Sequence, residues 1–312
     1  MTFREEAAMA GKGETGDGEG FRSGFVGIIG RPNVGKSTLL NAFARQKVAI
    51  ISDKPQTTRN RIRCVVDLED AQIVFVDTPG LHKPRNALGE RLNHRVRETL
   101  GDVDVVVFVL DGARGVGKGD SFIAGELAGL PTPVITALNK IDRLTPEELE
   151  GQLRKAESLG DFAAVIPVSA RTGENTHALL AKVRELLPPG PCYYPEGVVT
   201  DQPASFVVAE LIREKVLQLT REEVPHSVTV VVEEMEKEEG KDILEIRADI
   251  YVERDSQKGI IIGRGGQMLR EIGSRARQEI ELLLGERVFL DLHVKVEKDW
   301  TKRPGVITRL GL

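Results

Sequence analysis

Short apolar runs alternate with amphipathic stretches over the first half of the chain. The runs are FVGII (25–29), QIVFV (72–76), VDVVVFVL (103–110), VITAL (134–138) and VIPV (165–168). Near-continuous apolar strands separated by helices are typical of a parallel sheet that is covered on both faces. A further run, IRCVV (62–66), suits an antiparallel edge strand. We therefore expect a mostly parallel α/β domain over residues 23–187.

The pattern changes in the last third of the chain. Residues 204–220 are typical of a helix, and alternating apolar positions over 228–232 and 244–252 predict two half-buried strands. Apolar residues at helical spacing over 268–283 predict a long helix, and alternation returns over 288–296. Helices on one face of a small sheet indicate a smaller α+β domain, residues 204–312 with a C-terminal tail.

Two segments lie outside these domains. Residues 188–203 hold five prolines in sixteen positions, which predicts a partly extended linker. Residues 1–22 mix five glycines with acidic side chains, so we expect a disordered tail. This tail has no apolar core behind a basic start and is not expected to be a secretory signal. A length of 312 residues fits about two domains.

Composition limits the compartment and the partners. Two cysteines provide neither a disulfide framework nor a cysteine-built zinc site, and no window approaches the roughly 18 apolar residues of a membrane span. We expect a soluble, cytoplasmic protein. The net charge of −5 argues mildly against a nucleic-acid partner. Locally, however, residues 222–255 carry a net −8 and residues 258–312 a net +4, which allows such a partner on one face.

The first apolar run leads directly into a glycine-rich loop and a predicted helix. The loop has the form G-x-x-x-x-G-K-[ST], in which successive N–H groups surround phosphates. Lys36 is expected to neutralise the β- and γ-phosphates, and the Ser37 hydroxyl to ligate Mg²⁺. The predicted loop residues are Gly30, Arg31, Pro32, Asn33, Val34, Gly35, Lys36, Ser37 and Thr38.

The strand over 72–76 ends in Asp77, Thr78, Pro79 and Gly80, with Leu81 next. This places a carboxylate at the carboxyl edge of the sheet, where doubly wound folds bind ligands. We expect Asp77 to hold Mg²⁺ and the Gly80 N–H to bond the γ-phosphate.

A polar stretch, QTTR (56–59), lies between these two motifs. A threonine hydroxyl there would complete the Mg²⁺ shell only when the γ-phosphate is present, as a switch segment does. We favour Thr58, with Thr57 as the alternative. Lys36, Thr58 and Gly80 are the residues that we assign to the hydrolysis step from these motifs.

The strand over 134–138 ends in Asn139, Lys140, Ile141 and Asp142. A carboxylate at Asp142 would accept two N–H bonds from guanine, so the predicted nucleotide is GTP. Ser169 and Ala170 follow the next strand and join the predicted site. The segment DGARGVGKG (111–119) is also glycine-rich but lacks G-K-[ST], and we interpret it as a surface loop.

In the second domain, IIGRGG (261–266) places a G-x-x-G turn before the long helix. Positions without side chains let a nucleic-acid backbone come close, while cations contact phosphates and an apolar groove packs single-stranded bases. The predicted RNA-binding residues are Lys258, Gly263, Arg264, Gly265, Gly266, Arg270, Arg275, Lys295 and Lys298.

These motifs carry a resemblance to known families. The nucleotide motifs in this order resemble a translation-factor-class P-loop GTPase domain, and the second domain resembles a type II KH domain. Together with QTTR, DTPGLH and ERDSQKGIIIGRGG, they make the chain from residue 24 similar to the Era family of bacterial GTPases. The resemblance implies a small-subunit (30S) ribosome-assembly factor that binds the 3′ end of 16S ribosomal RNA. It also implies peripheral membrane association in some members. A further implication is a K⁺ near the phosphates at Asn33, which adds Asn33 to the residues of the hydrolysis step. Leu81 stands where Ras-like enzymes have a glutamine that orients the attacking water, and a leucine side chain cannot hydrogen-bond water, so we expect slow intrinsic hydrolysis.

Two other functions stay open at this point. One is an RNA-binding KH module whose nucleotide is largely structural, and the other is a membrane-associated GTPase signalling factor. The residues indicate no obligate protein partner, so we expect a monomer. The rate of GTP hydrolysis, measured with and without RNA, distinguishes these functions.

Overall fold

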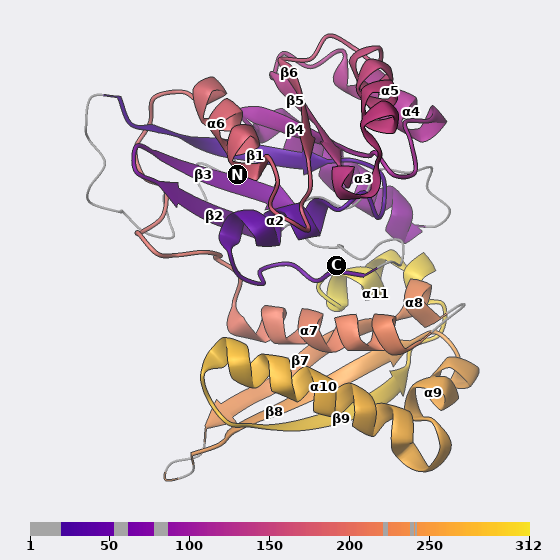
Figure 1. Cartoon of the computed structure of the whole chain (residues 1–312). Helices are drawn as coiled ribbons and strands as arrows, with labels where there is room; N and C mark the ends of the chain where they lie inside the picture. The colour runs from indigo at the N-terminus through magenta and orange to yellow at the C-terminus, as the bar shows by residue number, and fades with distance from the viewer. Residues whose placement is uncertain (1–19, 53–61, 78–86, 221–223, 238–239, 241) are drawn as a thin grey trace. The chain divides into compact units, whose positions relative to one another are not determined.

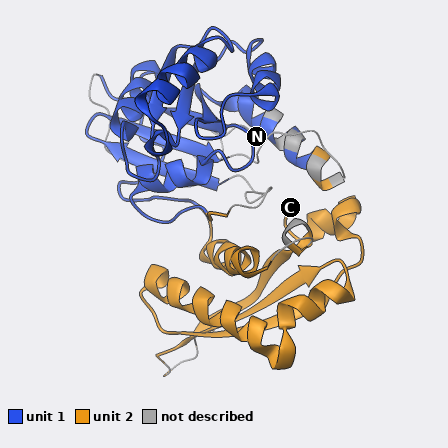
Figure 2. Cartoon of the chain, turned by 45° about the vertical axis from the view of Figure 1, so that its right-hand side comes forward, with its two compact units in different colours: residues 1–49, 58–83, 91–201 blue, residues 50–57, 84–90, 202–312 orange. Residues whose placement is uncertain are grey.

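The structure is a computed structural model that describes residues 20–52, 62–77, 87–220, 224–237, 240 and 242–312 (Figure 1). The chain divides into two compact units (Figure 2). Unit 1 comprises residues 1–49, 58–83 and 91–201, and unit 2 comprises residues 50–57, 84–90 and 202–312. Each unit has its own core, as the change of hydrophobic pattern near residue 203 predicts.

Unit 1 is built on a six-stranded sheet. Its strands are β1 (Arg22–Ile29), β2 (Ile62–Leu68), β3 (Ala71–Asp77), β4 (Val105–Asp111), β5 (Val134–Asn139) and β6 (Ala164–Val168). Their order is β2-β3-β1-β4-β5-β6, and β2 alone in this sheet runs antiparallel to its neighbour. The α/β fold class and the antiparallel edge strand are therefore confirmed.

Helices cover both faces of this sheet. They are α2 (Lys36–Ala44), α3 (Ala87–Asp102), α4 (Lys118–Leu127), α5 (Pro146–Glu157) and α6 (Thr176–Leu186). Successive strand residues point to opposite faces, so Val26 packs with α2 and α6, while Phe25 packs with α3, α4 and α5. The strands read as continuous apolar runs because both faces are buried.

The proline-rich segment packs largely against unit 1. Tyr194 is almost completely buried, and its carbonyl accepts a hydrogen bond from Gln72 Nε2 at 2.9 Å. The Val65 N–H donates to the Val199 carbonyl at 2.9 Å. The two units separate after Asp201, near the end of the predicted linker 188–203. Aromatic side chains and strand-edge hydrogen bonds explain why most of this segment is not a free spacer.

Unit 2 has a three-stranded sheet in the order β7-β8-β9. Strand β7 (Thr229–Lys237) runs antiparallel to β8 (Leu244–Val252), and β9 (Val288–Val296) runs parallel to β8. Its helices are α7 (Ala204–Leu219), α8 (Val224–Ser227), α9 (Asp255–Ile262), α10 (Gln267–Leu284) and α11 (Pro304–Arg309). Helices α7 and α10 lie side by side along the sheet (Figure 1). This confirms the predicted α+β domain.

The C-terminal residues belong to the core of unit 2. Trp300 has no exposed surface, and its indole N–H donates to the Ser227 carbonyl at 2.8 Å. Thr301 donates to the Glu253 carboxylate through both its N–H and its hydroxyl. The predicted C-terminal tail is therefore an integral layer of this unit. No helix in the described part of the chain is both long and apolar enough to cross a membrane.

The reactivity of the two cysteine thiols tests whether β2 is buried as the structure shows. Cys64 on β2 has no exposed surface, and burial, followed by nearby Asp77, raises the pKa of its thiol to about 12. Burial also raises the pKa of the partly exposed Cys192. Since the thiolate is the reactive form, we expect Cys64 to react with a disulfide reagent at about pH 8 only after denaturation. In a Cys192→Ala variant no thiol should react while the protein is native, and a rapid native reaction would contradict the burial of β2.

Candidate phosphate-loop site and helix groove

The loop between β1 and α2 is shaped by two glycines. Gly30 has φ of 156° and Gly35 has φ of 104°. A Cβ on Gly30 would lie 2.4 Å from the Val109 carbonyl oxygen, and one on Gly35 would lie 2.2 Å from Asn139 Nδ2. Both positions therefore need glycine for space as well as for backbone conformation. The loop ends at the N-terminus of α2, which favours an anionic ligand.

Lys36 lies inside this loop. Its ammonium donates to the carbonyls of Gly30 and Arg31, both at 3.2 Å. Burial lowers the pKa of Lys36 below its ordinary value, and the nearby Asp77 carboxylate opposes that shift. A buried cation held by carbonyls is incompletely compensated, so phosphate oxygens would stabilise its charged form.

Asp77 and Ser37 meet at the carboxyl end of β3. Asp77 is completely buried, and its Oδ2 accepts a hydrogen bond from Ser37 Oγ at 3.1 Å. The predicted Mg²⁺ ligands Ser37 and Asp77 thus lie together, and they provide the hard oxygen donors that Mg²⁺ prefers. The residue types therefore suit Mg²⁺, because a hydroxyl and a carboxylate lie next to each other beside the phosphate loop.

Asn139 and Lys140 hold the phosphate loop from the end of β5. Asn139 Nδ2 donates to the Val34 carbonyl at 2.9 Å, and its Oδ1 accepts from the Ala170 N–H at 3.0 Å. Lys140 Nζ donates to the Asn33 carbonyl at 2.7 Å. Two motifs separated by about 105 residues therefore form one structure.

Asp142 is held in place by the last predicted element of the site. Its Oδ1 accepts from Ser169 Oγ at 2.8 Å. Its Oδ2 is buried and receives no hydrogen bond from the described residues, although Arg171 Nε lies 3.2 Å away. A buried carboxylate oxygen with spare acceptor capacity fits a ligand that presents N–H donors.

Part of the predicted site lies outside the described residues. This part comprises Thr57, Thr58, Thr78, Pro79, Gly80 and Leu81. The other predicted nucleotide residues, from Gly30 to Thr38 and from Asn139 to Asp142 with Asp77, Ser169 and Ala170, surround the carboxyl ends of β1, β3, β5 and β6. Sequence reasoning missed Asp111, whose Oδ2 accepts from Lys140 Nζ at 2.6 Å.

In unit 2 the glycine turn connects α9 to α10. Gly263, Gly265 and Gly266 all have positive φ, between 56° and 76°. A Cβ on Gly263 would lie 2.7 Å from Met268 Cβ, whereas Gly265 and Gly266 face open space. The first glycine is therefore required for packing, and the last two leave the backbone accessible.

A groove of about 550 Å³ runs from this turn between α10 and β9. Its helix side is lined at helical spacing by Gly266, Arg270, Gly273 and Arg277, and its strand side by apolar residues that include Phe289. Phe289 is exposed over 59% of its surface. Arg277 and Phe289 were missed from the sequence. Arg277 lies seven residues after Arg270 and was therefore detectable on the same helix face, but Phe289 was not.

The predicted cations do not all line this groove. Arg270 does, and its guanidinium donates to the Gly265 carbonyl at 2.7 Å. Arg275 pairs with Glu271 instead, and Lys295 pairs with Asp249 in a separate hollow that Arg247 and His293 also line. Lys258 lies on α9, Arg264 is exposed in the turn, and Lys298 follows β9.

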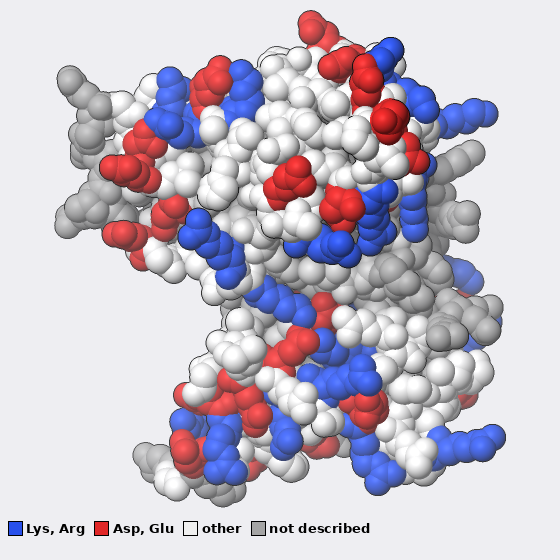
Figure 3. Space-filling model, in the orientation of Figure 1, with Lys and Arg blue, Asp and Glu red and all other residues white. Residues whose placement is uncertain are grey.

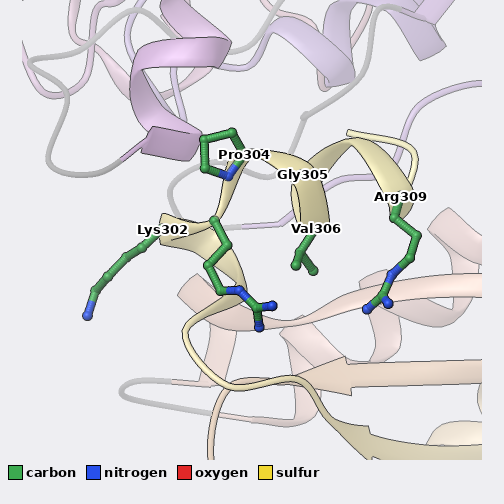
Figure 4. Close-up of a pocket in the computed structure, with 6 residues that line it drawn as sticks. Lys302, Pro304, Gly305, Val306 and Arg309 are labelled. Atoms are coloured by element: carbon green, nitrogen blue, oxygen red, sulfur yellow. The ribbon is translucent and has the colours of Figure 1, made fainter.

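Charge is mixed over the visible surface. Basic and acidic side chains intermingle on the face shown in Figure 3, so no region of one sign dominates it. Another hollow, of about 500 Å³, lies at α11 (Figure 4). There Arg303 and Arg309 both pair with Glu297, at 2.8 and 2.6 Å, and Lys302 extends to one side (Figure 4). These cations are largely compensated within the unit.

Comparison with known proteins finds a separate family match in each of the two units. A family described as 50S ribosome-binding GTPase matches residues 25–140, and the KH domain family matches residues 223–301. The chain is 50% identical over 291 residues to GTPase Era from Alkaliphilus oremlandii (strain OhILAs), covering 93% of this chain and 99% of that protein. The chain belongs to the Era family of GTPases. The expected family is thus confirmed.

Two solved Era structures resemble this chain over the same extent. One is Era in complex with MgGDPNP and nucleotides 1506–1542 of 16S ribosomal RNA, with a TM-score of 0.91 and 40% identity. The other is an Aquifex aeolicus Era variant bound to GDP and AlF₄⁻, with a TM-score of 0.88 and 40% identity. Each match covers 93% of this chain and 99% of the other chain. Because each match covers nearly the whole chain, the similarity includes both units.

Proposed function

We propose that this protein is a GTP-hydrolysing switch that binds the 3′ end of 16S ribosomal RNA and acts in assembly of the small (30S) ribosomal subunit. The observation that carries the proposal is the joining of the phosphate loop to Asn139 and Lys140, beside the buried Asp142 oxygen. Membership of the Era family supports it, as does the Era complex with a GTP analogue and 16S RNA. The G-x-x-G groove supplies a surface for RNA.

Different groups bind different parts of the nucleotide's phosphates. Lys36 neutralises the β- and γ-phosphates, and the loop N–H groups bind their oxygens. Ser37 and Asp77 would hold Mg²⁺, and the bound ion would supply positive charge that offsets the negative charge of the phosphates. Thr58, or Thr57, and the Gly80 N–H complete the site in this proposal. Leu81 lacks a hydrogen-bonding group for water, so unassisted hydrolysis is slow.

Guanine recognition depends on the Asp142 carboxylate. Its buried acceptor capacity suits the two adjacent N–H donors of guanine, and Ser169 fixes its orientation. Adenine lacks this donor pair, so a buried partner would stay unsatisfied, at about 1–3 kcal/mol per group. The same carboxylate would reject a base with a carbonyl at that position.

The base preference gives the first test. Asp142→Asn replaces one acceptor by a donor, which matches the carbonyl of xanthine. We expect GTP affinity to fall by at least about tenfold and XTP affinity to rise, as measured by competition with a fluorescent nucleotide. Glu174→Gln, a surface substitution, is the control and should leave both affinities unchanged. An equal loss of affinity for GTP and XTP would contradict the role of Asp142 in guanine recognition.

RNA is bound in the groove between α10 and β9. Arg270 and Arg277 lie on one helix face and contact phosphates, while Phe289 provides an aromatic surface on which a base stacks. Gly265 and Gly266 let the RNA backbone approach the turn, with Arg264 at its tip. Lys258, Arg275, Lys295 and Lys298 remain predictions, and the ion pairs of Arg275 and Lys295 favour a smaller contribution.

Phosphate and base contacts are separable by salt dependence. For a short RNA with the 3′-terminal sequence of 16S RNA, Phe289→Ala should weaken binding about tenfold with the salt slope unchanged. Arg277→Ala should weaken binding and reduce the slope of log affinity against log salt by about one. Arg154→Ala, an exposed arginine on α5 of unit 1 and outside the groove, is the matched control and should change affinity less than about twofold. Equal effects of all three would contradict RNA binding in this groove.

Asn33 is the proposed contact for K⁺ near the phosphates. It lies in the phosphate loop with φ of 66°, and its carbonyl is fixed by Lys140. A cation held there would add positive charge beside the phosphoryl group that is transferred. Hydrolysis should be at least about tenfold faster in K⁺ than in Na⁺, and Asn33→Ala should remove the difference. Equal rates in the two salts for the unaltered protein would contradict this role.

The switch proposal differs from its alternatives in its use of hydrolysis. GTP orders the segments near Thr58 and Gly80, RNA engages the groove, and hydrolysis releases the complex. A structural nucleotide would show negligible turnover that RNA does not change. We propose a cytoplasmic monomer whose partners are GTP, GDP, 16S RNA and the 30S subunit. Peripheral membrane contact stays a prediction of the family resemblance.

A further inference from the structure

The side chain of Arg31 leaves the phosphate loop and meets helix α4. Its guanidinium donates to Asp120 Oδ2 at 2.8 Å, and the Asp120 side chain is only 2% exposed. The same carboxylate oxygen accepts the Gly117 N–H at 2.9 Å. Asp120 therefore caps the first turn of α4 and binds the phosphate loop at the same time.

The glycine-rich segment 111–119 provides the room for this contact. A Cβ on Gly119 would lie 2.9 Å from Arg31 Cδ, so any larger residue displaces the arginine. At the other end of the segment, Asp111 accepts from Lys140 Nζ, which also donates to the Asn33 carbonyl. The interpretation of this segment as a plain surface loop was therefore incomplete, because it contacts the nucleotide loops at both ends.

Sheet order brings these segments together. Strand β4 lies between β1 and β5, so the segment that follows β4 emerges between the phosphate loop and the Asn139–Asp142 loop. The Gly112 N–H donates to the Asn139 carbonyl at 2.8 Å. Charged contacts at both ends then restrict the positions that the loop backbone can take.

We propose that Arg31 and Asp120 are positioning residues that hold the phosphate loop in its nucleotide-binding shape. The Arg31 carbonyl also accepts from Lys36, so this residue is fixed through both its backbone and its side chain. A loop ordered before binding loses less conformational entropy when the phosphates arrive. Loss of the pair therefore speeds nucleotide dissociation. The inference rests on the proposed binding of GTP and GDP.

The test is the dissociation rate of fluorescent GDP from the full chain. Arg31→Ala and Asp120→Asn should each raise the rate about tenfold, and the double variant should dissociate no faster than either single variant. Asp120→Asn keeps an oxygen that caps Gly117. Arg31→Lys, which keeps the charge, should restore most of the slow rate, but only when Asp120 is present. Additive effects, or a normal rate in Asp120→Asn, would overturn the inference and instead indicate that Arg31 acts on the nucleotide directly.

Gly119 gives a second, independent measurement. Gly119→Ala should speed dissociation in the unaltered protein and have no further effect in Arg31→Ala, because the crowded side chain is then absent. Gly125→Ala is the matched control, since it lies in the same helix with open space at its Cβ. An equal effect of Gly119→Ala in both backgrounds would overturn the inference. Failure of the unaltered protein to bind GDP would overturn the proposed function itself.

Discussion

The phosphate loop depends on side-chain hydrogen bonds to its carbonyls, from its own Lys36 and from Asn139 and Lys140 outside it. Its two glycines allow the backbone to bend, and four of its carbonyls accept hydrogen bonds from side chains. They are the carbonyls of Gly30, Arg31, Asn33 and Val34. Lys36, Lys140 and Asn139 supply the donors. Buried carbonyls without partners would cost about 1–3 kcal/mol each, so the loop and the base-recognition segment are stable only as one structure.

Both units place their functional surfaces in a similar way. In unit 1 a glycine with positive φ, Gly35, precedes helix α2, and in unit 2 Gly266 precedes helix α10. Each glycine stands directly before a helix N-terminus, where negative charge is favoured. The surroundings differ, because Asn139 Nδ2 packs against Gly35 whereas Gly266 faces open space.

The two sites differ in what surrounds that turn. The phosphate loop is contacted by polar side chains from two other strand ends, Asp77 of β3 and Asn139 of β5, and Ser169 after β6 holds Asp142. The groove between α10 and β9 has an apolar strand side and arginines on its helix side. Selectivity for a small ligand needs buried, matched hydrogen bonds, whereas a flexible single strand is bound through stacking and phosphate contacts.

Much of the architecture followed from spacing along the chain. Apolar runs and alternation predicted the strands and the helices α2, α7 and α10, because these features depend on neighbours in sequence, whereas α8, α9 and α11 were not predicted. The proline-rich segment was less predictable, since its packing depends on where Tyr194 and Gln72 meet.

By itself, then, the sequence determined the turns, the periodic elements and the chemistry at each strand end. Tertiary structure alone decided which of those ends touch. Arg31 and Asp120 are 89 residues apart, and nothing in their local patterns links them. They pair because β4 lies beside β1 in the sheet, so the segments that follow these two strands are neighbours. Phe289 likewise becomes part of a groove only when β9 lies beside α10.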